Sequence, residues 1–373
     1  MVVTGSAGKS TTTKMLVAIV RAHGKEVFTN PSTANISQGF YSAILERANL
    51  FGRIDGEVAI LEMDEGHAAE ITARVSPTQS TILNVLEDQL DRFVDPALVR
   101  EKLALVAGRT KGPILLNADD QNTILIGSEI GSELAKQVSW FGIANDLIDG
   151  TRHGLGAAPT YKTQLPRPRI DAEILTIEGT SATANLDGNV AEFNLPNRGL
   201  HYALDSIAAL TSASRYLAND FDLALAASVL DELPPVFARG EIAEVGGEEI
   251  EFILVQNPMS FQLNLDNLTT NPEQIMVAIG RDVHDPSWLW TVDLSSLTHI
   301  NIVSGYNYAE IALRMAYADI PIGEVEPNLE TAIEKFLALP QPNHGMKTVI
   351  FSADAMRRTR RILGFTDPEA VDR

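Results

Sequence analysis

A glycine-bracketed turn near the start of the sequence constrains the fold more than any other feature. Short apolar residues lead into Gly5-Ser6-Ala7-Gly8, and Lys9-Ser10 then open a run that is compatible with a helix. A strand, such a turn and a helix in this order form a phosphate cradle, because glycines let backbone N–H groups turn inward and a helix N-terminus attracts anions. Lys9 can reach the terminal phosphates, and the Ser10 hydroxyl can bind Mg²⁺. The sequence therefore predicts a nucleoside triphosphate site.

Short apolar runs, each followed by a helical pattern, fill the first part of the chain. They cover residues 57–63, 80–85 and 113–117. Near-continuous apolar strands joined by helices form a parallel sheet that is covered on both faces. We therefore predict an α/β domain over residues 1–232, with a small β insertion at about 142–194 and a helical run over 199–230. Because so few residues precede the glycine turn, we also expect that the natural chain begins earlier.

A proline pair at positions 234 and 235 predicts a hinge. Four further apolar runs follow it, at 250–255, 274–279, 299–303 and 348–351. The pattern predicts a second doubly wound α/β domain over residues 233–373.

Composition excludes several classes of site and partner. The 373 residues contain no cysteine, which excludes disulfides, thiolate metal sites and a cysteine nucleophile. No apolar run approaches the ~18–20 residues that span a bilayer. The net charge of −20 repels nucleic acid and anionic surfaces at long range. We expect a cytoplasmic globular protein that binds no nucleic acid.

Carboxylates follow the apolar run that ends near residue 61. Glu62 and Asp64 are expected at the sheet edge where doubly wound folds bind ligands. A carboxylate there can bind Mg²⁺ beside Ser10, directly or through water. Glu62 follows directly on the apolar run and is the better candidate, whereas Asp64 and Glu65 fit solvated charges at a strand end equally well.

Several segments resemble, in order, the MurT subunits of lipid II isoglutaminyl synthases, which are relatives of the Mur ligases. The first turn has the short G-x-x-G-K-S-T-T form of Mur ligases, and Val3 stands where the longer phosphate-loop pattern has glycine. Residues 83–93 resemble the T-N-x-x-x-D-Q-L-D-R signature of the MurT family. The other matching segments are residues 29–35, 60–65, 116–120, 237–241, 256–258 and 285–290. Together they extend over nearly the whole chain.

This resemblance implies a fold and an activity. The fold would be a Mur-ligase-like ATPase domain with a small β insertion, followed by a Rossmann-like C-terminal α/β domain. The enzyme would use ATP to phosphorylate the α-carboxyl of D-glutamate in the lipid II stem peptide, and ammonia would convert the acyl phosphate to D-isoglutamine. A GatD-like glutaminase subunit would supply the ammonia in a heterodimer. The reaction would take place at the inner face of the membrane.

The resemblance also assigns roles to single residues. Lys9 and Glu62 would take part in catalysis, and Ser10 and Glu62 would bind Mg²⁺. The residues that would contact ATP are Gly5, Gly8, Lys9, Ser10, Thr11, Asn84, Asn117 and, from the second domain, Arg239.

A further role falls on the segment around Asp285. In the resembling family, an aspartate of this motif completes the catalytic triad of the glutaminase across the subunit interface. Asp285 is our candidate, Asp282 is close enough to be confused with it, and an aspartate that only caps a turn before proline is the structural alternative. Trp288 and Trp290 would be the aromatic anchors of the interface.

At several positions the sequence differs from the family pattern. Residues 142–194 lack the four zinc-binding cysteines that family members commonly have, so we expect no zinc. Tyr202 and Asp205 stand where asparagines near adenine are usual. Gln256 and Asn307 replace a lysine and an arginine, which removes two cations from the expected cleft.

Two other functions stay open at this point. One is an amino-acid-adding ligase of the Mur or folylpolyglutamate type, and the other is a non-catalytic ATP-binding scaffold for the glutaminase. The four departures at Tyr202, Asp205, Gln256 and Asn307 keep the scaffold in consideration.

Overall fold

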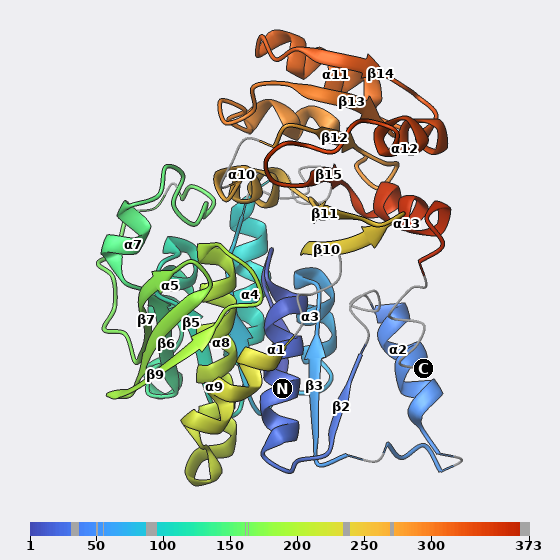
Figure 1. The fold of residues 1–373 in the computed structure, drawn as a ribbon. Helices are drawn as coiled ribbons and strands as arrows, with labels where there is room; N and C mark the ends of the chain where they lie inside the picture. Colours follow the sequence, from blue (N-terminus) through green and yellow to red (C-terminus); the bar gives the residue numbers. More distant parts are fainter. Residues whose placement is uncertain are drawn as a thin grey trace. The chain divides into compact units, whose positions relative to one another are not determined.

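A computed structural model describes most of the chain. The described residues are 1–30, 37–49, 51–54, 56–86, 95–160, 162, 164–233, 239–268 and 272–365. They form two compact units, the first within residues 1–86 and 95–233 and the second within residues 239–365. Each unit has a mixed α/β structure around its own sheet (Figure 1). The predicted α/β class is thereby confirmed.

The first unit is built on a nine-stranded sheet with the order β2-β3-β1-β4-β5-β6-β7-β8-β9. The pairs from β2 to β7 are parallel, and β8 and β9 continue the sheet as antiparallel strands. The strands are β1 (Val2–Thr4), β2 (Val27–Thr29), β3 (Val58–Glu62), β4 (Ser80–Ile82), β5 (Ile114–Asn117), β6 (Val138–Ile143), β7 (Ala172–Glu178), β8 (Ser181–Leu186) and β9 (Asn189–Asn194). Strands β7–β9 occupy the region where we predicted a β insertion, and they extend the main sheet.

Helices cover both faces of this sheet. The helices α1 (Lys9–Ala22), α8 (Leu200–Leu217) and α9 (Leu223–Glu232) share one apolar core, and α3 (Glu65–Thr72), α4 (Pro96–Arg109) and α5 (Gln121–Glu129) lie on cores of the other face. The remaining helices are α2 (Ser37–Arg47), α6 (Ser132–Ala135), α7 (Asn145–Asp149) and the short η2 (Ala218–Asp220). No helix of the described residues is long and apolar enough to cross a membrane.

The predicted helical run over 199–230 is two helices rather than one. Ala218 has a φ of 50°, which an α-helix does not accommodate, and α8 ends there. Asp222 then begins α9, because its carboxylate accepts hydrogen bonds from the N–H groups of Ala224 and Leu225. The carboxylate of Asp231, near the other end of α9, accepts hydrogen bonds from the backbone N–H and the side-chain amide of Asn194, the last residue of β9.

The second unit contains a six-stranded sheet with the order β10-β11-β15-β12-β13-β14. Only β10 is antiparallel to its neighbour. The strands are β10 (Arg239–Val245), β11 (Glu248–Leu254), β12 (Ile275–Ala278), β13 (Ile300–Ser304), β14 (Ile322–Val325) and β15 (Lys347–Phe351). The helices α10 (Pro258–Asp266), η3 (Pro286–Thr291) and α11 (Tyr308–Tyr317) pack on one face, and α12 (Leu329–Leu337) and α13 (Ala353–Ile362) pack on the other.

A buried lysine ties α12 to this sheet. The Lys347 side chain is 1% exposed, and its Nζ donates to the carbonyl oxygens of Leu337 and Leu339 at 2.8 and 2.7 Å. Its third partner is the Glu248 carboxylate at 2.8 Å, and this bond lowers the pKa of Glu248. The ammonium therefore satisfies carbonyl groups at the helix C-terminus that would otherwise lack partners.

We expect Lys347→Met to lower the free energy of unfolding by about 2–4 kcal/mol, because it leaves two buried carbonyls and a carboxylate without their cation. Glu248→Gln, which keeps a hydrogen-bond acceptor beside Lys347, should cost much less. Urea unfolding of the full chain measures both. Equal stability of Lys347→Met and the parent would contradict this role.

Candidate functional site

The loop between β1 and α1 has the backbone geometry of a phosphate cradle. Gly5 and Gly8 have φ values of 135° and 83°, a region that favours glycine. A Cβ atom on Gly8 would lie 2.1 Å from Oδ1 of Asp205, and one on Gly5 would lie 2.9 Å from the backbone nitrogen of Asn84. Only glycine fits at either position, and α1 begins directly after Gly8.

Lys9 lies against this loop. Its Nζ donates to the carbonyl oxygens of Gly5 and Ser6 at 2.5 and 3.1 Å. The positive charge is therefore held where the phosphates of a nucleotide are expected, beside the N-terminus of α1.

Ser10 and Glu62 meet across the loop. The Ser10 hydroxyl donates to Oε1 of Glu62 at 3.0 Å, and Glu62 is buried. Asn30 fixes the backbone of Glu62, because its amide donates to the Glu62 carbonyl at 2.9 Å and accepts from the Glu62 N–H at 3.0 Å. Sequence reasoning gave Asn30 no role, although an asparagine directly after β2 is a recognisable signal. A hydroxyl and a carboxylate oxygen at this spacing suit Mg²⁺, which takes few protein ligands.

Asp64, the next acidic residue of this segment, has a structural role at the start of α3. Asp64 caps α3 by accepting a hydrogen bond from the Gly66 N–H at 3.2 Å. Within the part of the chain that the structure describes, no group of three or more histidine or acidic side chains gathers as a metal cluster. A Mg²⁺ ion that is bound mainly by phosphates and water does not need one.

Asn84 holds the loop from the neighbouring strand. Its Oδ1 accepts from the Ala7 N–H at 2.8 Å, and its Nδ2 donates to the Ala7 carbonyl at 3.2 Å. The Ser6 hydroxyl accepts from the Leu86 N–H at 3.1 Å. Asn84 thus shapes the loop through main-chain bonds, and contact with a nucleotide stays a prediction.

The end of β5 is joined to the same edge of the sheet. The amide of Asn117 donates to the Leu83 carbonyl at 2.9 Å and accepts from the Asp119 N–H at 2.8 Å. Asp120 is fully buried and accepts the Val85 N–H at 2.6 Å. Burial raises the pKa of Asp120 to about 6, although hydrogen bonds from Val85 and Asn122 act in the opposite direction. Asn117 and Asp120 connect strand ends, and a nucleotide-lining role for Asn117 stays a prediction.

Helix α8 brings a carboxylate against α1. Asp205 is buried, and its Oδ1 accepts the Thr12 hydroxyl at 3.3 Å, next to the buried Thr11. Asp205 was noted in the sequence only as a departure from asparagine. In the structure it is one reason why Gly8 must be glycine.

Two predicted segments lie outside the described side chains. The backbone of Arg239 begins β10, but its side chain is not among those described. Residues 31–36 and 87–94, which hold parts of the family-like motifs, also lie outside the described residues.

In the second unit, the structure separates the two candidate aspartates. Asp282 accepts the Ser352 hydroxyl at 2.6 Å and the Ala353 N–H at 2.9 Å, so both of its carboxylate oxygens are used at the start of α13. Asp285 is exposed and accepts the Ser287 N–H at 2.9 Å with one oxygen. Hydrogen bonds from Ser287 lower the pKa of Asp285, so this carboxylate is ionised at neutral pH.

The expectation that two tryptophans form interface anchors is wrong for one of them. Trp288 is 9% exposed and packs edge-on against Phe261 in the apolar core. Trp290 is 45% exposed, contacts Tyr317 edge-on and lies under the guanidinium of Arg314. Alternate sides of η3 therefore face the core and the surface.

The two replaced cations have different surroundings. Asn307 is buried, and its amide donates to the carbonyl oxygens of Gly280 and Val283, both at 2.9 Å. It thus fixes the backbone that leads to Asp285. Gln256 is exposed and precedes Asn257, which caps α10.

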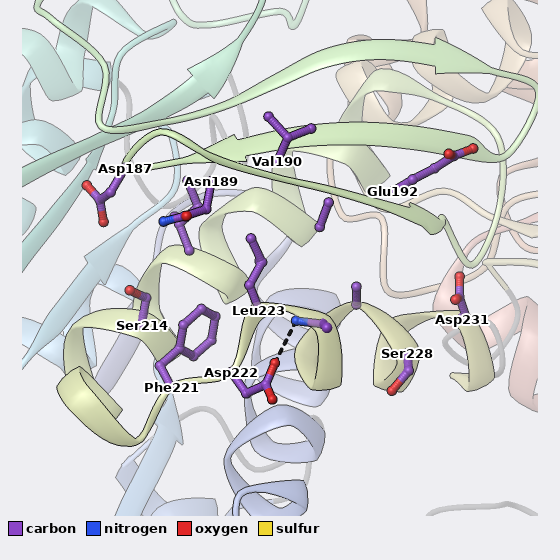
Figure 2. A pocket seen from close by; sticks show the side chains of 14 residues that line it. Asp187, Asn189, Val190, Glu192, Ser214, Phe221, Asp222, Leu223, Ser228 and Asp231 are labelled. Atoms are coloured by element: carbon purple, nitrogen blue, oxygen red, sulfur yellow. Dashed lines mark hydrogen bonds between the residues drawn. The ribbon is translucent and has the colours of Figure 1, made fainter.

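A pocket with a volume of about 790 Å³ lies elsewhere in the first unit, between the β8–β9 hairpin and the α8–α9 segment (Figure 2). Asp187, Glu192, Asp222 and Asp231 are among its lining residues, and none of the predicted site residues is. Asp187 pairs with Arg215, and Asp222 caps α9. The acidic groups of this pocket therefore have structural partners.

Comparisons with known proteins agree with the geometry. Residues 3–154 match the Mur ligase middle domain, and residues 254–353 match the MurT ligase C-terminal domain. The chain is 24% identical to the MurT subunit of lipid II isoglutaminyl synthase (glutamine-hydrolyzing) of Streptococcus pneumoniae, over 90% of this chain and 80% of that protein.

Solved structures show the same fold. A pseudomurein peptide ligase type C from Methanothermus fervidus has a TM-score of 0.74 at 18% identity, covering 97% of this chain and 78% of its own. MurF ligase from Thermotoga maritima in complex with ADP has a TM-score of 0.65 at 18% identity, covering 100% of this chain and 80% of its own. The resemblance found in the sequence is confirmed. The chain therefore contains regions that match a Mur ligase middle domain and a MurT ligase C-terminal domain, and this similarity supports an ATP-dependent, Mur-type ligase of peptidoglycan synthesis.

Proposed function

We propose that this chain is the synthetase subunit of a glutamine-dependent amidotransferase. It amidates the α-carboxyl of D-glutamate in the lipid II stem peptide to D-isoglutamine, and a GatD-like glutaminase supplies the ammonia. The observation that carries this proposal is the exposed, ionised Asp285 within the region that matches the MurT C-terminal domain. An amino-acid-adding ligase has no glutaminase partner, so it does not need an exposed carboxylate that could reach a partner's histidine.

The first step is phosphorylation of the substrate carboxylate. A carboxylate oxygen attacks the γ-phosphorus of ATP, the bond to the bridging oxygen breaks, and ADP leaves with that electron pair. Lys9 and the N–H groups between Gly5 and Ser10 stabilise the charge on the phosphate oxygens. Ser10 and Glu62 would hold Mg²⁺, which would supply positive charge to the phosphates of the nucleotide.

The second step forms the amide. Ammonia attacks the carbonyl carbon of the acyl phosphate, inorganic phosphate leaves, and the nitrogen loses a proton. The acyl phosphate also reacts with water, so amidation requires that ammonia arrives at a protected site. A glutaminase bound to the same chain meets this requirement.

Asp285 acts on the partner rather than on the stem peptide. Its exposed carboxylate would accept the second ring N–H of a histidine in the glutaminase, fix the tautomer of that histidine, and stabilise the imidazolium that forms when a cysteine is deprotonated. The exposed Trp290 and Tyr317 are of the residue types that anchor interfaces.

We expect Lys9→Ala to reduce ATP-dependent amidation by the complex at least ~100-fold, because the transferring phosphoryl group loses its cation. The fold should persist, since the Lys9 ammonium binds carbonyl oxygens of the loop rather than groups of the apolar core. Lys102→Ala, on the exposed side of α4, is the matched control and should keep full activity. Undiminished ATP turnover in Lys9→Ala would refute the site.

Glu62→Gln tests the metal assignment separately. We expect the Mg²⁺ concentration for half-maximal activity to rise by about 10-fold or more, because the amide lacks the charge of the carboxylate that faces Ser10. Mg²⁺ titrations of ATP hydrolysis measure the shift. An unchanged Mg²⁺ dependence would contradict the metal assignment and would indicate that Glu62 has only a structural role at the end of β3.

Asp285→Asn should affect amidation differently when glutamine or added ammonia is the nitrogen donor. Glutamine-driven amidation by the complex should fall by about 100-fold or more, while amidation driven by added ammonia continues. Asp222→Asn, which changes another helix-capping aspartate, should leave both rates unchanged. Equal loss with both donors, or with neither, would contradict the triad role. Transfer of an amino acid in place of ammonia would favour the ligase alternative.

A further inference from the structure

Three large apolar side chains are exposed within a short stretch of the first unit, on α2 and just after it. Tyr41 and Leu45 are 46% and 76% exposed, and Phe51 is 89% exposed. Tyr41 and Leu45 are four residues apart on α2 and so share one face. The inner side of the helix is occupied, because Phe40 packs against the core that contains Met63 and Ala68. Single exposed apolar residues are common, but a group of this size marks an interaction surface.

Hydrogen bonds hold the turn that carries Phe51. Oδ1 of Asn49 accepts the N–H groups of Phe51 and Arg53 at 2.9 and 3.1 Å. The Asn49 N–H donates to the Arg53 carbonyl at 2.8 Å, and the Gly52 N–H donates to the Asn49 carbonyl at 2.8 Å. Gly52 has a φ of 71°, which closes the turn. Phe51 is therefore presented to its surroundings by an ordered turn, which lowers the entropy lost on binding.

Two exposed arginines, Arg47 and Arg53, stand on either side of Phe51 in the chain. Residues 37–53 hold these two cations and one acidic residue, Glu46, whereas the whole chain has 29 basic and 49 acidic residues. Aromatic and aliphatic tips flanked by guanidinium groups match the interface of a lipid bilayer, where apolar groups reach the acyl chains and arginines bind phosphates.

We propose that the surface formed by Tyr41, Leu45, Phe51, Arg47 and Arg53 is a reversible contact site for a phospholipid bilayer. The choice of a bilayer rests on the proposed function, because a lipid-linked substrate lies in one. Few inserted side chains give weak, reversible attachment, which suits an enzyme that moves between membrane-bound substrates.

The available area favours a membrane over a protein. Three large side chains offer at most about 600 Å², which is below the ~800 Å² that each partner of a stable protein complex buries. Attachment to a bilayer requires only the insertion of such tips, with nearby cations at the phosphates.

The test is co-sedimentation of the full chain with vesicles of phosphatidylcholine containing one fifth phosphatidylglycerol, at physiological salt and without lipid II or nucleotide. At this ionic strength charges beyond about 8 Å are screened, so the local arginines outweigh the acidic remainder of the chain. Leu45→Ser/Phe51→Ser should lower the partition coefficient about 10-fold or more. Arg47→Gln/Arg53→Gln should lower it several-fold. Val75→Ser, which removes another exposed apolar side chain of the same unit, should leave it unchanged.

Several results would overturn the proposal. One is that the parent protein does not sediment with vesicles. Another is that Leu45→Ser/Phe51→Ser binds vesicles as the parent does. A third is that this double variant mainly loses self-association or binding to the glutaminase. Amidation of a water-soluble, short-chain analogue of the substrate keeps the two proposals apart. The double variant should retain this activity, whereas failure of the parent to amidate the analogue would reject the proposed function and leave the vesicle result standing.

Discussion

Parallel pairing of β1 with β3 and β4 determines where the polar groups of the nucleotide site can lie. Val3 pairs with Glu62, and Thr4 pairs with Ile82, so the carboxyl ends of the three strands reach the same edge of the sheet. The loop after β1 must turn sharply there to begin α1, and it has room only because Gly5 and Gly8 lack side chains. Ser10 at the start of α1, Glu62 at the end of β3 and Asn84 just after β4 then meet at this loop. The site is thus a consequence of strand order and of two missing Cβ atoms.

The most apolar strands of both sheets and the proximity of Ser10 to Glu62 could be predicted from the sequence, because apolar runs and a glycine turn are local signals with few structural solutions. Short strands such as β2 and β14 could not be predicted. The hydrogen-bond partners could not. Asn84 binds Ala7, and Asn30 binds the backbone of Glu62, and each pair depends on the register of strands that no local pattern fixes. The burial of Trp288 could not be predicted for a different reason: Trp288 and Trp290 lie two positions apart on the short η3 helix, and only tertiary packing decides which of them is buried.

The substitutions in the second unit gain a physical interpretation. An arginine at position 307 would need an anionic partner, whereas Asn307 uses its amide to hold two carbonyls of the segment before Asp285. Asp282 fixes the same segment to the start of α13. The segment before Asp285 is therefore held by the amide of Asn307 and by the carboxylate of Asp282. The carboxylate of Asp285 remains exposed at the surface.

The hydrogen bonds between Asp231 and Asn194 affect how the free edge of the first sheet can pair with other strands. Strand β9 is the last of nine, and a free strand edge can pair with another molecule. At the end of β9 the Asp231 carboxylate binds the backbone N–H of Asn194, and Glu192 adds an exposed carboxylate along the strand. A strand that paired with β9 would have to displace the Asp231 carboxylate and would lie beside the Glu192 carboxylate. The three-stranded extension therefore ends in an edge that is protected against pairing with another molecule.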